Sequence, residues 1–321
     1  MSTLTTPRNV RTSVAGPTPA EIAALPIRPR VGPGIWITTG MAVYAGLLLV
    51  QLFVFNDNWR WDVVASYLFS QVVLTGLFNT IVLTLLTTAC GLVLGVVTAY
   101  CRMSSLPVLR TFATLYIGLM RATPPLVMLL FVFFFGALVP TLAFGIPFGP
   151  TFFAVPTSEV VSRFSAAVIG LSIYFGAFSA EIFRSGVLAL PPGQLEACKA
   201  LGLPPLRAYQ KILAPQIIRV ITPAMANEVI TVFKNTSLVS VIGYSELLTT
   251  VQTIYARNFE TIPLLMVAVV WYLVLTSIAT FAQAWLERRV GHGFGHRSTS
   301  KRRWTRAIKT PSSANTQEDT R

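Results

Sequence analysis

Five polar side chains between positions 227 and 235 are the residues of this chain best suited to bind a polar solute: Asn227, Glu228, Thr231, Lys234 and Asn235. At 100° per residue they fall within an arc of about 120° on one α-helix. The surrounding sequence is apolar, and such groups are costly in a membrane unless they face water, a solute or another protein. We therefore expect this arc to line a translocation path. A contact with another subunit and an ion pair inside a helix bundle are the alternatives.

Arg121 is a second cation within an apolar run, and Thr123-Pro124-Pro125 follows it. Thr123 could cap a helix that restarts with Pro124 as its first residue, which would leave Arg121 at membrane depth on the solute path. Alternatively, residues 103–120 lie partly at the inner interface and Arg121 lies among lipid headgroups. The sequence leaves both open.

Other reactive residue types indicate structure rather than catalysis. Glu181 and Arg184 are three residues apart near the inner end of a helix, so we expect a structural salt bridge. His292 and His296 lie in a Gly-rich basic segment that we expect to be flexible and solvated, without a metal. The three cysteines, at 90, 101 and 198, show no paired spacing. We find no intramembrane His, Asp pair or Ser nucleophile, so we do not expect an enzyme.

The composition places these residues in a membrane protein. Of 321 residues, 53% are hydrophobic and 12% are charged, and the mean hydropathy is +0.64; soluble domains have about a quarter charged. The net charge of +13 is better explained by cytoplasmic loops beside anionic lipid than by nucleic acid.

The apolar runs predict an all-α, polytopic transmembrane bundle with six spans, near residues 35–55, 74–100, 111–139, 164–184, 221–243 and 262–286. Residues 1–34 are expected to be a disordered basic tail, and residues 287–321 a second basic tail. With the N-terminus inside, the inner segments hold 20 Lys and Arg residues and the outer segments three. This asymmetry predicts that both termini are cytoplasmic.

Small residues recur every four positions in two spans, and we interpret them as close helix packing. They are Thr87, Gly91, Gly95 and Ala99 in one span, and Ser172, Gly176 and Ala180 in the other.

The least membrane-like internal stretch is 193–216, which the orientation places in the cytoplasm. Two turns of helix over 194–201 would end at Gly202 in a left-handed cap, and Pro204 would begin a second helix ending near Leu213. We expect Pro215 to discourage continuation. The pair is amphipathic, so it requires its own bundle or a soluble partner.

The stretch resembles the EAA loop of ABC-importer permeases, on Glu196-Ala197-Cys198, Gly202 and Ile212-Leu213-Ala214-Pro215. Further motifs resemble the branch that imports polar amino acids: NTIVLT (79–84), RATPPLV (121–127), AEIFRSG (180–186), GQLEA (193–197) and KNTSLVSVIG (234–243). The resemblance covers residues 70–286, so the span at 35–55 is an addition to the usual five-helix core. Asn235 replaces an Asp that is common in the branch.

This resemblance implies a permease subunit in the bacterial cytoplasmic membrane that moves a polar amino acid by alternating access. It implies that Glu196, Ala197, Cys198, Gly202, Ile212 and Pro215 couple the chain to ATPase subunits. It also implies an external solute-binding protein and a second permease subunit, identical or different. The chain has no G-x-x-x-x-G-K-[ST] phosphate loop, so ATP and Mg are expected on the partner ATPase and no cofactor in this chain.

An ion- or proton-coupled secondary transporter is the rival function. It requires acidic residues in the path, and Glu228 is the one good candidate.

Overall fold

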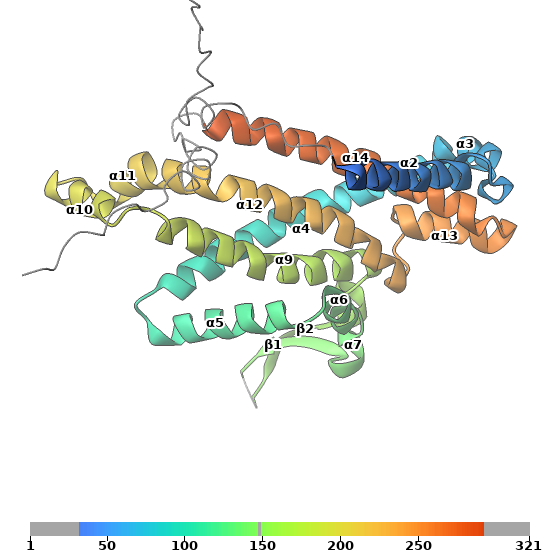
Figure 1. Ribbon diagram of the computed structural model, residues 1–321. Helices are drawn as coiled ribbons and strands as arrows, with labels where there is room; N and C mark the ends of the chain where they lie inside the picture. The colour runs from blue at the N-terminus through green and yellow to red at the C-terminus, as the bar shows by residue number, and fades with distance from the viewer. Residues whose placement is uncertain (1–31, 147–148, 292–321) are drawn as a thin grey trace, which may run out of the picture. The chain divides into compact units, whose positions relative to one another are not determined.

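The computed structural model describes residues 32–146 and 149–291, which are mostly helical (Figure 1). Most of the tail predicted for 1–34 and nearly all of the tail predicted for 287–321, with His292 and His296, lie outside the described residues. The chain divides into two units, Met1–Trp59 and Arg60–Arg321. The first contains α2 (Pro33–Val54) and the 3₁₀ turn η1 (Asp57–Trp59). The indole N–H of Trp59 donates to the Leu52 carbonyl at 2.9 Å and fixes this turn against its helix.

The second unit is built from long helices joined by short ones. Its long helices are α4 (Gln71–Met103), α5 (Pro107–Ala122), α9 (Arg163–Leu188), α12 (Ala214–Asn235) and α14 (Thr261–Gly291). Its short helices are α3 (Trp61–Leu68), α6 (Pro125–Phe133), α7 (Phe135–Leu138), α8 (Thr157–Val160), α10 (Gly193–Ala200), α11 (Pro205–Ala208), the π-helix η2 (Tyr209–Leu213), the 3₁₀ helix η3 (Thr236–Ile242) and α13 (Leu247–Asn258).

Among the described residues, four helices are long and apolar enough to cross a membrane: α2, α4, α9 and α14. The bent pair α5–α6 makes a fifth if it is one span. α12 falls outside this set and carries Arg219, Glu228 and Lys234. The fold is therefore a mostly helical membrane protein with four or five candidate spans, and six spans with both termini inside stay a prediction.

The span predicted at 111–139 is not one straight helix. α5 ends at Ala122, α6 begins at Pro125, and the two axes differ by 108°. The expectation that Thr123 caps the restarted helix is wrong. Thr123 is the extended C-cap of α5, and its hydroxyl donates to the Leu119 carbonyl at 2.8 Å, while Pro124 is the N-cap of α6. Consecutive prolines force this break, because each lacks an N–H and holds the preceding residue out of the α conformation.

The core lies where α4 and α9 pack closely, as the small residues predict. A Cβ added at Gly91 would fall on the Phe175 ring, and one at Gly95 would fall on the Ser179 hydroxyl. The Ser172 and Ser179 hydroxyls donate to the carbonyls of Thr87 and Gly91, each at 3.2 Å. Small residues thus bring the two backbones together and supply hydrogen bonds between them.

A β-hairpin between α7 and α8 amends the all-α expectation. β1 (Thr141–Gly145) pairs antiparallel with β2 (Thr151–Pro156), and the register is irregular between Phe144 and Gly145. Phe, Val and Thr favour strands, and Gly145, Gly149 and Pro150 punctuate the turn. The apolar run that we assigned to a span therefore continues into a sheet.

Candidate functional site

The predicted helix pair at 193–216 is present, and Gly202 forms its hinge. Gly202 has φ of +65°, the left-handed conformation that glycine adopts readily. The Leu203 N–H donates to the Cys198 carbonyl at 3.1 Å and the Gly202 N–H to the Lys199 carbonyl at 3.0 Å. These two bonds make a Schellman motif, which satisfies the last carbonyls of α10.

The two short helices are fixed to each other and to α12 through small and polar contacts. Cys198 on α10 and Ala208 on α11 are both 3% exposed. The Gln216 side-chain amide in the first turn of α12 donates to the Gln194 side chain at 3.3 Å and to the Ile212 carbonyl at 3.0 Å. Motion of this pair would therefore be transmitted to α12, and motion of α12 to the pair.

Two details of the pair differ from expectation. Pro204 is the N-cap of α11, and Pro205 is its first residue. Pro215 does not end the second helix: the chain runs from α11 through η2 directly into α12. The Ala214 N–H bonds to the Tyr209 carbonyl, five residues back. This wider π turn absorbs the proline, which would otherwise clash with the carbonyl of residue 211.

The outward surface of the pair mixes charged and apolar side chains. Glu196, Ala197, Lys199 and Arg207 are exposed, and Pro215 is exposed while Ile212 is partly buried. Four large apolar or aromatic side chains are also about half exposed or more: Leu195, Leu201, Leu206 and Tyr209. Exposed leucines among charges on an aqueous loop are typical of a protein-docking surface.

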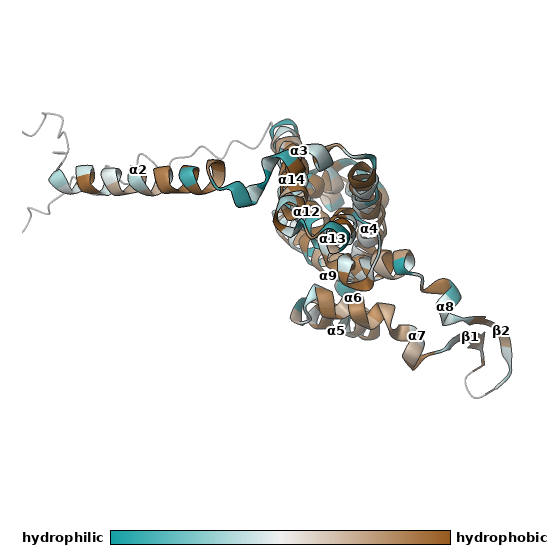
Figure 2. Cartoon of the chain, turned by 90° about the vertical axis from the view of Figure 1, so that its right-hand side faces the viewer, coloured by the Kyte–Doolittle hydropathy of each residue, from teal (hydrophilic) through white to brown (hydrophobic). Residues whose placement is uncertain are grey.

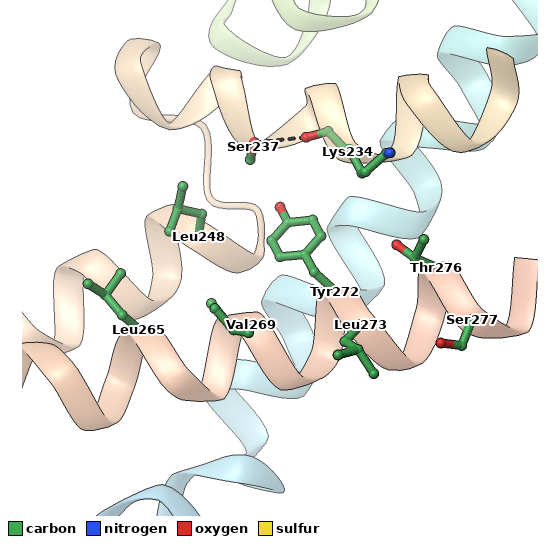
Figure 3. Close-up of a pocket in the computed structure, with 10 residues that line it drawn as sticks. Lys234, Ser237, Leu248, Leu265, Val269, Tyr272, Leu273, Thr276 and Ser277 are labelled. Atoms are coloured by element: carbon green, nitrogen blue, oxygen red, sulfur yellow. Dashed lines mark hydrogen bonds between the residues drawn. The ribbon is translucent and has the colours of Figure 1, made fainter. Parts of the chain in front are cut away.

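Lys234 lines an open pocket of about 620 Å³ between the end of α12 and α14. Lys234 and Ser237 lie on one side of it, and Tyr272 and Thr276 project from α14 opposite them (Figure 3). Lys234 is exposed, and among the described residues no carboxylate lies within ion-pair distance of it. The pocket therefore offers a cation, hydroxyls and an apolar floor.

The five residues of the arc share α12, but its members face different neighbours. Glu228 interacts electrostatically with Tyr174 of α9, whose ring lies 4.8 Å from that of Phe178. The Arg121 guanidinium lies over the Phe178 ring at 5.9 Å. Glu228 and Arg121 thus flank one aromatic pair, whereas Lys234 lines the α14 pocket. Asn227 is exposed, and Thr231 and Asn235 are partly buried.

The salt bridge predicted between Glu181 and Arg184 is present at 2.5 Å, and Arg102 of α4 completes it as a triad. All three side chains are about a quarter exposed. Sequence reasoning did not single out Arg102, because nothing in the sequence indicates which span ends meet. The triad joins α4 to α9 near the end of α9 that leads into the helix pair at 193–216.

The sequence reasoning also missed a buried carboxylate, Glu246, at the start of α13. It is fully buried and accepts hydrogen bonds from the Leu248 and Thr249 N–H groups at 2.9 and 2.7 Å and from the Tyr272 hydroxyl at 2.9 Å. Glu246 thereby fixes the tyrosine of the Lys234 pocket. The one sequence signal that could have indicated Glu246 is its position directly before an apolar helix, where an acidic residue can act as the N-cap.

Two of the sequence motifs meet beside Glu246, at the start of α13. Asn79 of NTIVLT donates to the Ser245 carbonyl at 2.8 Å, and the buried Thr80 hydroxyl accepts from the Leu247 N–H at 3.0 Å. KNTSLVSVIG supplies Lys234, η3 and Gly243, whose φ of +71° ends η3. The motifs therefore hold the frame around the pocket, while Lys234 itself faces the open space.

Comparisons with known proteins agree with these features. Residues 91–292 match the family model described as binding-protein-dependent transport system inner membrane component. The chain is 38% identical to the arginine transport system permease protein ArgU of Corynebacterium glutamicum, over 88% of this chain and 86% of that protein. It is 33% identical to the arginine transport system permease protein ArtQ of Bacillus subtilis, over 68% of this chain and 92% of that protein.

The match to ArgU covers 283 of the 321 residues, so at most 38 residues lie outside it. Because α2 ends at Val54, the match must include part of α2. Among solved structures, the crystal structure of an amino acid ABC transporter with histidines is 31% identical, with a TM-score of 0.58 over 68% of this chain and 94% of that one. An inward-facing MetNI methionine ABC transporter is 18% identical with a TM-score of 0.52, covers 68% of this chain and 96% of that one, and shares the fold.

Proposed function

The chain belongs to the family of binding-protein-dependent transport system inner membrane components and is the permease subunit of an amino acid ABC importer, and from this premise we propose how it works. It is a multi-pass protein of the inner membrane and a transport component rather than an enzyme. Family membership implies an ATPase and a binding protein as partners. It also argues against the ion-coupled rival.

The proposed mechanism is alternating access by two permease subunits, identical or different. The external binding protein delivers the solute, and the ATPase subunits hold ATP and Mg. Closure of the ATPase moves α10 and α11, and the Gln194–Gln216 contact carries this motion into α12. The observation that carries the proposal is the Gly202-hinged pair with its mixed exposed surface, fastened directly to the helix that bears the polar arc.

The proposed topology has six spans with both termini cytoplasmic, and α12 is the fifth of them and the most polar. The distribution of Lys and Arg supports it, with 20 such residues inside and three outside. Single cysteines at the exposed positions Ser158 and Ala256, in a variant lacking the three native cysteines, should react with an impermeant thiol reagent in intact spheroplasts. Cysteines at Ala189 and Ser300 should react only after permeabilisation, and the reverse pattern would overturn the topology.

The proposed solute is a polar amino acid, with the Lys234 pocket on its path. An unpaired ammonium facing Tyr272 and Thr276 suits an α-carboxylate. Arginine is the first solute to test, since two of the similar permeases are named for arginine transport. Glu228 and Arg121, on the α9 side, are proposed to act at a separate point of the path.

Lys234→Met tests the path, because it removes the charge and keeps a similar length. Uptake into vesicles that contain the complete transporter should fall by at least about tenfold, the loss expected when one charge-assisted hydrogen bond of about 1.5–3 kcal/mol is removed. Lys234→Arg keeps the charge and is the control. Normal uptake with impaired assembly would make Lys234 a subunit contact instead.

Glu196→Lys tests the coupling part separately. It reverses an exposed charge on the docking surface and leaves the spans unaltered. Uptake should fall, together with the ATP hydrolysis that loaded binding protein stimulates. If the variant reached the membrane, retained its ATPase and transported normally, the coupling proposal would be wrong.

A further inference from the structure

The β1–β2 hairpin lies in a stretch that carries no charge. Residues 122–158 contain no Asp, Glu, Lys, Arg or His, and both strands fall inside this run. The hairpin is not needed for the transport mechanism above. Among the described residues, its main contacts are between its own strands and with the short helix α8 that follows it. An isolated two-stranded hairpin is marginally stable in water at best, so it requires some covering surface.

One face of the hairpin is apolar throughout. Phe144 lies directly opposite Phe153, and Leu142 lies opposite Val155. Because residues two apart on a strand share a face, these four side chains point the same way. Phe144 is 75% exposed and Phe153 is 65% exposed. The paired residues of the other face are smaller or weakly polar: Thr141, Ala143, Ala154 and Pro156. Phe152, which is 67% exposed, lies in the register irregularity and has no partner on β1.

The hairpin also projects in a particular direction. The long helices of the second unit run side by side in Figure 1, and Figure 2 views them nearly end-on. In Figure 2 the hairpin extends sideways, away from α4, α9 and α12. Since the helices cross the membrane, a sideways projection lies in the membrane plane rather than out into the aqueous phase.

We propose that the face formed by Leu142, Phe144, Phe153 and Val155 is a lipid-binding surface, on which the hairpin rests in the membrane interface. Aromatic side chains on such a face insert at the boundary between headgroups and acyl chains. The unpaired edges of a two-stranded sheet need water or headgroups as partners, so the hairpin lies flat at the interface and does not enter the hydrocarbon.

The absence of charge is what favours lipid over an external binding protein. A site that docks a soluble protein has a polar rim around its apolar centre. Neither strand supplies a charged residue to such a rim, and the nearest charges along the chain are Arg121 and Glu159. A membrane is the environment in which an uncharged face with exposed phenylalanines is stable.

The test places a fluorophore on each face of the same strand. Phe144→Cys and Ala143→Cys are made in a variant without the three native cysteines and labelled with an environment-sensitive dye. The permease with its ATPase is reconstituted, without binding protein, in vesicles of phosphatidylethanolamine and phosphatidylglycerol. Quenching is measured with nitroxide-labelled lipid and with aqueous iodide. Phe153→Cys and Ala154→Cys repeat the pair on β2, in case one labelled variant does not assemble.

Nitroxide lipid should quench the dye at 144 several times more strongly than the dye at 143, and iodide should show the opposite preference. Quenching of both positions by iodide alone would overturn the proposal and leave the hairpin free for a soluble partner. Shielding of position 144 from both quenchers would also overturn it, because another protein chain in the complex would then cover the face.

Discussion

The proposed coupling loop (193–216) and the hairpin (141–156) both leave the helix bundle with large apolar side chains exposed, yet they differ in the charges that accompany those side chains. The loop alternates its leucines with Glu196, Lys199 and Arg207, whereas the hairpin has no charge at all. The loop is closed by a Schellman motif and a glutamine pair. Among the described residues, the main contacts of the hairpin are its own ladder and α8. Exposed apolar area therefore does not identify a partner: the charges interleaved with it do.

The largest effect is expected at the hinge of the loop. Gly202→Val should abolish uptake, because a β-branched residue in the left-handed conformation costs at least about 1–2 kcal/mol. No atom lies within 4 Å of the added Cβ, so the effect comes from the backbone alone. Gly193→Val is the matched control, since that glycine has equally open space and no positive φ. Uptake assays on both variants, with membrane levels checked, decide the matter, and equal uptake would refute the hinge.

A lysine placed on each region should separate their roles. Leu206→Lys alters the proposed docking surface of an aqueous loop, so ATPase co-purification and stimulated hydrolysis should fall severalfold while insertion is unchanged. Phe144→Lys places an ammonium against lipid, so it should leave hydrolysis intact and move the hairpin outward. Both native side chains are about two-thirds exposed or more, so neither change disturbs a core. If both variants lost ATPase binding, the distinction between the regions would fail.

A moderate effect is expected at the junction of α4 and α13, away from both regions. Thr80→Val keeps the shape of a fully buried side chain but leaves the Leu247 N–H without its acceptor. An unsatisfied buried donor costs about 1–3 kcal/mol. Thermal unfolding of the detergent-solubilised complex should shift downward, with little change in coupling loop behaviour. Thr75→Val, on the same helix but with its hydroxyl bonded only to the Gln71 carbonyl, is the control.

The smallest effect is expected at Cys198. Cys198→Ala replaces one small buried residue by another, so the helix pair should stay closed and uptake should be nearly normal. Cys198→Leu overfills the same contact and should cost about 1–3 kcal/mol, since added methylenes in a packed site force neighbours apart. Uptake of the two variants, compared at equal expression, tests whether the pair needs a close contact. A tolerated leucine would show that it does not.

The sequence alone determined the membrane class, most of the long apolar helices and the left-handed turn at Gly202. These follow from local chemistry: apolar runs of sufficient length, small residues every four positions, and a glycine where a left-handed turn ends a helix. The polar arc on α12 was equally accessible, because helical periodicity fixes which residues share a helix.

Only the tertiary structure decided which of those residues meet. It turned Lys234 toward α14 and Glu228 toward α9, and it brought Arg102 to Glu181 across a sequence separation that no local pattern spans. In the structure, η2 carries the chain through Pro215. The apolar run after α7 forms strands, because an apolar run by itself does not distinguish a membrane span from a sheet. Partners across elements depend on how the helices pack, and the chain specifies that packing only through all of its contacts together.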